Sequence, residues 1–289
     1  ADGDVYDYFD GIADLAHGRI RFVGRAFERV EEDYLRILRY FRFYAHYGRP
    51  PLDRDAVAAC RRHAERLHDL SGERVRDEFL KILAARDPAD VVLLMRANGI
   101  LEHVLAEAGD ASRLRMTAWL DSRALAIDGV TPDPVRRLAA LLRPDLESAH
   151  VAAAASRLRL SNWETDRLIA MTEPIDGLDA ETDTQDRRRI LHRFGAEQAR
   201  DAVLLAWANE LTIQPKLPAA RTEAWRTWLE ECADWRGPVF PLKGRDVLDL
   251  GVPAGRRVGE LLRTVEAWWE AGDFQASRDD CLAHLRDLI

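Results

Sequence analysis

The chain has 289 residues, 47% of them apolar, and its formal net charge at pH 7 is −8. This composition provides enough apolar side chains for a sizeable core, and the negative balance argues against a uniformly basic nucleic-acid binder, although local basic patches can still bind RNA. The cysteines, Cys60, Cys232 and Cys281, predict no disulfide framework and fit a reducing cytoplasm. No run reaches the roughly 20 apolar residues that span a bilayer, so no membrane role is expected.

Helix-forming residues dominate, so we expect an all-α fold with a short β element near the amino terminus. Residues 5–9 and 19–23 are predicted to form two strands around a turn. Helices are expected over about residues 27–47, 53–67 and 73–83, the last one capped by Ser71. Further helices should begin after Asp133-Pro134 and Ser161-Asn162. The segments 173–186 and 213–223 interrupt the helical pattern.

The segment 31–48, EEDYLRILRYFRFYAHYG, is the most informative part of the sequence. On one helix, a carboxylate and three arginines would follow each other at three-residue steps and form a row on the surface. This row, called the surface row below, comprises Asp33, Arg36, Arg39 and Arg42. Tyr40 and Phe43 are expected on the same face, opposite a broad apolar face. Aromatic rings beside guanidinium groups suit a nucleobase and its phosphates.

Asp33 and Arg36 together could read a base. Cytosine and adenine both present an exocyclic amine beside an unprotonated ring nitrogen, so an acceptor next to a donor matches both of them. Uracil and guanine present the reverse pattern and would leave buried polar groups unsatisfied, at a cost of roughly several kcal/mol. The alternative is that Asp33 and Arg36 form only a helix-surface ion pair, worth about a few tenths of a kcal/mol.

Residues 32–43, EDYLRILRYFRF, resemble the EDxLRxLRxxRF motif of the tRNA nucleotidyltransferase and poly(A) polymerase family, which includes the class II CCA-adding enzymes. Residues 5–24 resemble the end of that family's catalytic head, with Asp10-Gly11 where Gly-Gly is commoner. Residues 70–83, LSGERVRDEFLKIL, are similar to its SxERIxxEL element. Residues 241–274 resemble its tail, with Arg256 where proline is frequent.

The resemblance implies a division into a head remnant (residues 1–25), a neck (26–98), a body (99–214) and a tail (215–289). It implies that Asp33 and Arg36 read the base of incoming CTP or ATP, and that Arg39 and Arg42 lie in the same nucleotide-binding site. By geometry, Arg42 could instead brace the neck through Asp14 or a helix terminus.

The resemblance implies two further sets of residues. The element around Ser71, Glu73 and Arg74 is expected to be structural, a cap and an ion pair that hold the neck helices at a fixed angle. In the tail, Gly255 to Val258 could present helix N-terminal amides to an RNA backbone, with Arg256 and Arg257 nearby. The partner implied for these surfaces is the 3′ end and acceptor arm of tRNA.

Members of this family hold Mg²⁺ with a DxD pair that follows a Gly-Ser segment in the head. Nucleotidyl transfer needs such metal-bound carboxylates. We find no Gly-Ser preceding a DxD in this sequence, and Asp2 and Asp4 lack the supporting context. We therefore expect a fragment or one half of a split enzyme, which would not transfer nucleotides alone.

Several alternatives remain open. Within the family, a poly(A) polymerase or an enzyme adding only CC or only A fits the same residues. A non-catalytic RNA-binding helical module is a second possibility. The third is a metal phosphohydrolase using His68-Asp69, with Cys60 and His63 at ligand-like spacing. The tail tryptophans are expected mainly to pack in a core.

Overall fold

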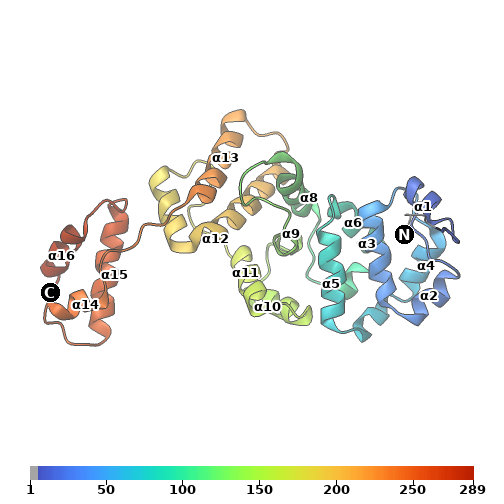
Figure 1. The fold of residues 1–289 in the computed structure, drawn as a ribbon, viewed down its shortest axis with the longest axis horizontal. Helices are drawn as coiled ribbons and strands as arrows, with labels where there is room; N and C mark the ends of the chain where they lie inside the picture. Colours follow the sequence, from blue (N-terminus) through green and yellow to red (C-terminus); the bar gives the residue numbers. More distant parts are fainter. Residues whose placement is uncertain (1–5) are drawn as a thin grey trace.

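The computed structural model describes residues 6–289, which form helices joined by loops in an elongated arrangement (Figure 1). The first half of the chain contains α1 (Gly11–His17), α2 (Ala26–Glu32), α3 (Leu35–Tyr47), α4 (Arg54–Arg62), the 3₁₀ helix η1 (Ala64–Asp69), α5 (Gly72–Leu83), α6 (Pro88–Ala97), α7 (Leu101–Val104), α8 (Ser112–Trp119), the π-helical turn η2 (Leu120–Ala124) and α9 (Pro134–Leu141). The second half contains α10 (Ser148–Arg157), α11 (Asn162–Thr172), α12 (Thr184–Ile213), α13 (Ala219–Asp234), α14 (Gly244–Asp249), α15 (Arg256–Ala271) and α16 (Arg278–Asp287). The expected all-α fold is confirmed.

The two strands expected near the amino terminus do not form in the residues described. Val5 lies outside these residues, and from Tyr6 onward the structure contains no strand, only an isolated antiparallel bridge between Ala108 and Leu142. The segment between the two expected strands is helix α1 rather than a tight turn. Since a lone pair of strands is only marginally stable, a hairpin without a sheet beside it has little to hold it.

Asp10 explains one departure from the family pattern. It precedes α1 with φ 61° and ψ 26°, in the left-handed region. Glycine reaches this conformation without strain, and Asp tolerates it better than most residues do. This position is therefore one where the commoner glycine and the Asp found here can adopt the same backbone.

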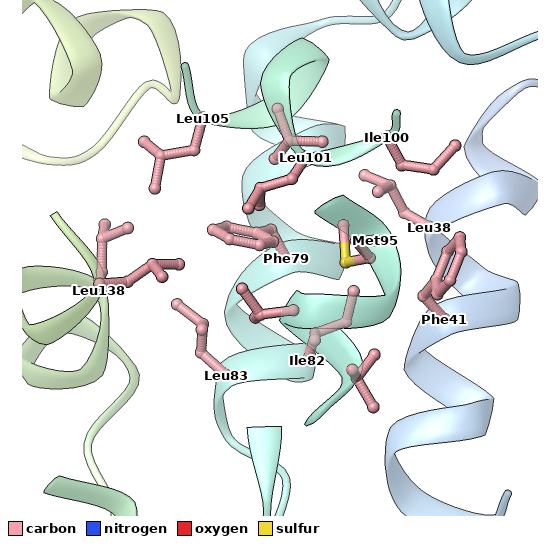
Figure 2. Packing of buried hydrophobic residues seen from close by; sticks show 14 of the residues in the cluster. Leu38, Phe41, Phe79, Ile82, Leu83, Met95, Ile100, Leu101, Leu105 and Leu138 are labelled. Atoms are coloured by element: carbon pink, nitrogen blue, oxygen red, sulfur yellow. The ribbon is translucent and has the colours of Figure 1, made fainter. Parts of the chain in front are cut away.

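The first and largest core runs from α2 to α11 and joins the expected neck to the expected body. Figure 2 shows Phe41 of α3 near Met95 of α6, and Phe79 of α5 between them and Leu138 of α9. These side chains are almost fully buried. Helix α3, which carries the arginines of the surface row, packs against α5, and α5 in turn packs against α9. Helix α3 is therefore fixed to the body through α5.

Two further cores follow along the chain. The second is centred on α12 and α13 and includes the buried Trp225 and Trp228, while the third lies among α14–α16 and includes Trp269. These three tryptophans pack in cores as expected, whereas Trp268 is 38% exposed and stacks on His284. The change of core between α13 and α14 falls after residues 213–223, the segment expected to separate body from tail, and that division stays a prediction.

Several expected helix starts are confirmed. Asp133 caps α9 by accepting a hydrogen bond from the Arg136 N–H at 2.8 Å, and Ser161 forms a capping box with Glu164 at the start of α11. Ser71 stands at the N-cap of α5, but its side chain makes no capping hydrogen bond. The expected helix over residues 53–67 is shorter, because α4 ends at Arg62 and a 3₁₀ helix follows.

Candidate functional site

The helix expected over residues 27–47 is broken at Asp33. Helix α2 ends at Glu32, Asp33 is extended with φ −158° and ψ 109°, and α3 begins at Leu35. The Asp33 carboxylate accepts a hydrogen bond from the Leu35 N–H at 3.1 Å, the local turn that short acidic side chains favour. The prediction of one continuous helix was wrong. Asp before an apolar run is a helix-start signal that could have located the break.

Asp33 is held by Arg74 of α5. The Arg74 guanidinium donates to both oxygens of the Asp33 carboxylate, at 3.1 and 3.0 Å. The side chain of Asp33 is 26% exposed. Asp33 is therefore fixed in position but still reachable.

Arg36 is held by the end of α2. Its Nη1 donates to the Glu32 carboxylate at 2.6 Å and to the Arg29 carbonyl at 2.7 Å. Hydrogen bonds from Arg36 and Arg29 lower the pKa of Glu32. Within residues 6–289, Asp33 and Arg36 form no ion pair with each other, and Nε and Nη2 of Arg36 make no hydrogen bond. The helix-surface ion pair between Asp33 and Arg36 is thus not what the structure contains.

Arg39 and Arg42 share one buried carboxylate, Glu78 of α5. Arg42 Nη1 lies 3.1 Å from a Glu78 oxygen, and Arg39 Nε lies 3.9 Å from the other oxygen. The Glu78 side chain is 7% exposed, and Lys81 Nζ stands 3.5 Å away. Arg42 thus braces α3 against α5 rather than against Asp14, which pairs instead with Arg21 at 2.6 Å.

The two aromatic residues expected beside the surface row, Tyr40 and Phe43, differ in exposure. Phe43 is 45% exposed beside the Arg42 guanidinium, as the helical pattern predicts. Tyr40 is only 3% exposed and stacks on Phe22, so its expected exposure was wrong. The reason is that the loop before α2 covers this side of α3, which a single-helix projection cannot show.

Helix α5 holds three of the four residues of the surface row, whereas Arg36 is held by α2, and the sequence only partly predicted this. Arg74 and Glu78, one turn apart on α5, contact Asp33 at one end of the row and the arginines at the other. Glu73 lies 3.8 Å from Arg159 of the body, an exposed contact. The expected ion pair is therefore present, through Arg74. Glu78 was not singled out, although it is the second glutamate of the SxERIxxEL-like element.

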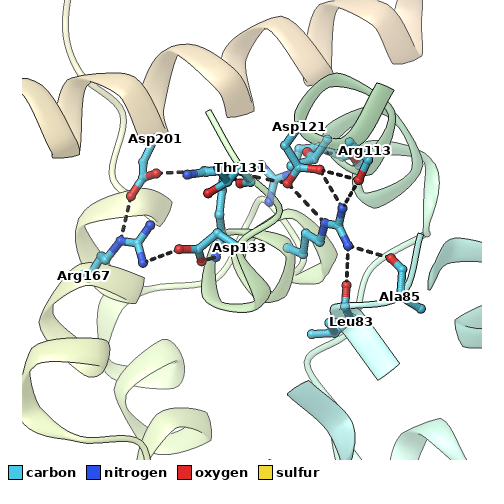
Figure 3. A network of polar contacts seen from close by, with 12 residues as sticks. Leu83, Ala85, Arg113, Asp121, Thr131, Asp133, Arg167 and Asp201 are labelled. Carbon is cyan, nitrogen blue, oxygen red and sulfur yellow. Dashed lines mark hydrogen bonds and ion pairs between the residues drawn. The ribbon is translucent and has the colours of Figure 1, made fainter. Parts of the chain in front are cut away.

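A buried polar network joins α5 to the body (Figure 3). Arg137 of α9 is fully buried and donates to the carbonyls of Leu83 and Ala85, both at 2.7 Å. It also donates to the Asp121 carboxylate at 2.6 Å. Because Leu83 is the last residue of α5, this helix, which contacts Asp33, Arg39 and Arg42, is hydrogen-bonded directly to the body.

The network continues through Arg136 and Arg167. Arg136 Nε donates to Asp201 at 2.8 Å, and Arg167 donates to Asp201 and Asp133, each at 2.8 Å. Burial raises the pKa of Asp121 despite the hydrogen bonds from Arg137. Burial alone would raise the pKa of Asp133 as well, but the Arg136 N–H and the Arg167 guanidinium together lower it.

Other candidate residues lie elsewhere. Arg256 opens α15 and is 91% exposed beside Glu260 at 2.8 Å, and Arg257 is also exposed. His68 Nε2 lies 3.0 Å from His103 Nδ1, and Asp69 pairs with Arg66 at 2.9 Å. The carboxylate of the His68-Asp69 pair is therefore held by a cation. No helix within residues 6–289 is both long and apolar enough to cross a membrane.

Similarity to known proteins extends over almost the whole chain. A family profile described as "Probable RNA and SrmB- binding site of polymerase A" matches residues 51–111. The chain is 30% identical to the CCA tRNA nucleotidyltransferase 1, mitochondrial, of Danio rerio over 98% of its own length, and 28% identical to the Homo sapiens protein of that name over 99%. It spans 62% of the length of each of these relatives.

The fold matches a solved structure. The Bacillus stearothermophilus CCA-adding enzyme, crystallised in complex with CTP, superimposes with a TM-score of 0.72 at 24% identity, covering 98% of this chain and 68% of that one. The helical architecture described above is thus the one found in that enzyme. Along almost its whole length, the chain is therefore similar in sequence to the CCA tRNA nucleotidyltransferases, and it has the fold of a CCA-adding enzyme.

Proposed function

We propose that this chain is the neck, body and tail portion of a tRNA nucleotidyltransferase that adds C, C and A to the 3′ end of tRNA. The observation that carries this proposal is similarity to CCA tRNA nucleotidyltransferases along 98–99% of the chain. The proposed substrates are CTP, ATP and tRNA. The Bacillus stearothermophilus enzyme of the same fold was crystallised with CTP, which supports the first of these. The compartment stays a prediction, since both named relatives are mitochondrial proteins.

Base selection is assigned to Asp33 and Arg36. Each carboxylate oxygen can accept two hydrogen bonds, and Asp33 Oδ2 accepts only the one from Arg74 within the described chain. Arg36 retains the N–H groups of Nε and Nη2 as donors. One acceptor and one donor thus remain for the amine and ring nitrogen of cytosine or adenine.

The contact of Arg74 of α5 with Asp33, called the brace below, supports this assignment. A site that selects a base by hydrogen bonding needs its groups held within about half an ångström of the productive geometry. Arg74 holds Asp33 and Glu32 holds Arg36, so neither group depends on the nucleotide for its position. Arg39, whose side chain is 45% exposed, is the arginine of the row best placed to reach the triphosphate.

The residues around the surface row do not fit Mg²⁺. Asp33 is taken by Arg74, and Glu78 is surrounded by Arg39, Arg42 and Lys81, so neither carboxylate offers the oxygen-rich setting this ion requires. In our proposal the Mg²⁺-binding carboxylates belong to a nucleotidyltransferase head outside these 289 residues.

The test measures nucleotide binding by the purified chain with CTP, ATP, UTP and GTP. Wild type should bind CTP and ATP more tightly than UTP and GTP. Asp33→Ala should reduce the preference for CTP and that for ATP by about tenfold or more, because one or two charge-assisted hydrogen bonds are lost. Asp77→Ala is the matched control, because Asp77 is an exposed residue of α5 that pairs with Arg76. An unchanged preference in Asp33→Ala would refute the assignment.

Catalysis has its own test. The pure chain should not incorporate CTP into tRNA lacking its 3′ end, whereas adding a family nucleotidyltransferase head as a second polypeptide should restore incorporation of CTP and ATP. Robust incorporation by the chain alone would contradict the proposal. Stepwise products would separate full CCA addition from CC-only, A-only or poly(A) addition.

A second candidate function is a non-catalytic RNA-binding module. The profile over residues 51–111, described as an RNA-binding site, favours it. Such a module would keep its affinity for tRNA in an Asp33→Ala, Arg36→Ala double variant and would show no nucleotide preference before the change. Under our proposal, nucleotide preference is present in wild type and is lost in this variant.

A further inference from the structure

A side-chain cluster far from the surface row lies where the body meets the tail. His192 of α12 faces Glu266 and Glu270 of α15, and one potential ligand atom from each side chain lies within 4.8 Å of the other two. In the part of the chain that the structure describes, this is the one group of three or more such side chains. The two elements come from different hydrophobic cores, so the cluster spans a junction.

We propose that His192, Glu266 and Glu270 bind one divalent transition-metal ion of the Zn²⁺ type, which fastens α15 to α12. His192 Nε2 lies 3.5 Å from Glu270 Oε1. Two ligand atoms bound at about 2.0–2.1 Å to a tetrahedral ion stand about 3.4 Å apart, so these two atoms already have the required separation. One imidazole with two carboxylates is a donor set that suits Zn²⁺ and its neighbours.

Uncompensated charge is an independent reason to expect a cation. Glu266 and Glu270 stand one turn apart on α15, where like charges repel. Within residues 6–289, the Glu266 carboxylate makes no hydrogen bond or ion pair, and the Glu270 carboxylate pairs with His192 alone. Two carboxylates close together without an arginine or lysine partner are stabilised by a bound dication.

The arginines of the same junction are engaged elsewhere. Arg189 donates to the backbone carbonyls of Glu270 and Ala271, at 3.5 and 3.2 Å, near the carboxyl end of α15. Arg188 pairs with Asp273 at 2.6 Å. These contacts dock the helix end on α12 and leave the two glutamates without a guanidinium partner.

The histidine is held in place. Its ring packs edge-on against Trp269, with centroids 5.8 Å apart, and lies 5.0 Å from Phe274. The side chain is 18% exposed and that of Glu270 is 34% exposed, so an ion can enter from solvent. Three protein ligands leave a fourth tetrahedral position for water. The site is independent of nucleotide selection and does not rest on the function proposed above.

The experiment uses the untagged chain, stripped with a chelator and then titrated with Zn²⁺ or Co²⁺. We expect one ion per chain and, with Co²⁺, visible absorption of a four-coordinate site. His192→Ala, Glu266→Gln and Glu270→Gln should each weaken binding at least about tenfold. Mg²⁺ at equal concentration should not compete, because it prefers oxygen ligands.

A matched control separates binding from folding. Glu260→Gln changes another glutamate of α15, one that pairs with Arg256, and should leave metal affinity unchanged. Unfolding midpoints without metal identify any variant that fails to fold, and Glu266→Gln should be at least as stable as wild type, because Glu266 has no partner to lose and its charge repels Glu270. No saturable binding by wild type, or wild-type affinity in His192→Ala, would overturn the proposal.

Discussion

The surface row and the buried network use the same residue types in opposite ways. Asp33 and Arg36 are each about a quarter exposed and keep unused hydrogen-bonding capacity. Arg137 and Asp121 are fully buried, and Arg137 donates to two carboxylate oxygens, two carbonyls and a hydroxyl. The presence of an Arg–Asp pair therefore does not distinguish a recognition surface from a structural contact. What distinguishes them is how many hydrogen-bond donors and acceptors of the pair have no partner within the protein.

Helix α5 connects the two regions. Its first two turns carry Arg74 and Glu78 toward the surface row, and its last residue, Leu83, accepts a hydrogen bond from Arg137. The body therefore fixes the position of α5, and α5 fixes Asp33, Arg39 and Arg42. Substitutions in the buried network should therefore destabilise the folded protein. Substitution of Arg74, which holds Asp33, should instead change ligand selection in a protein that still folds.

The largest effect is expected for Arg137→Ala. It removes both hydrogen bonds of Arg137 to the buried Asp121, which keeps only Ser122 and a longer contact with Arg136 at 3.7 Å, and it removes the Arg137 donor from two carbonyls. Removing one partner of a buried pair costs about 3–5 kcal/mol of unfolding free energy. Urea unfolding followed by circular dichroism measures this loss. The control is Arg157→Ala, which removes a partly exposed pair with Glu107 and should cost about 1 kcal/mol at most. Similar losses in both variants would erase the distinction between structural contact and surface.

Sequence patterns predicted the helical class and the apolar face of α3 well. The helix starts at Asp133 and Ser161 also followed from capping residues, because these signals are local. The exposure of Phe43 followed from helical spacing alone. That of Tyr40 did not, since the residue covering it, Phe22, comes from a loop outside the helix.

The brace and the network lie beyond local patterns. Arg74 contacts a residue 41 positions earlier, and Arg136 contacts one 65 positions later. In the sequence PVRRLAALL, two arginines next to each other resemble a solvated helix edge. The packing of α5, α8, α11 and α12 around α9 makes both of them interior, and such packing has no signature within one helix.

A smaller effect is expected for Arg74→Ala, which tests the brace. Asp33 would keep its turn with the Leu35 N–H but lose the guanidinium, so its carboxylate would be less fixed. Because the pair is partly exposed and worth up to about 1 kcal/mol, the preference for CTP over UTP should fall about two- to fivefold. Competition binding measures the ratio. Arg76→Ala on the same helix, whose partners are Asp77 and the Arg159 carbonyl, should leave the ratio unchanged. A shift in Arg76→Ala alone would contradict the brace.

The smallest effect is a pH dependence at the surface pair of Glu107 and Arg157. Burial by itself would raise the pKa of Glu107, but the Arg157 guanidinium holds it below its ordinary value. A depressed carboxyl pKa stabilises the folded state above the unfolded pKa, and this contribution is lost as pH falls through the folded pKa. The stability difference between wild type and Glu107→Gln should therefore be constant near pH 7 and shrink below about pH 4.5. Urea unfolding at pH 7, 5, 4 and 3 measures it. A difference that grows toward acid would mean that Glu107 is destabilised rather than stabilised by its surroundings, and the pair would then resemble Asp121, whose pKa burial raises.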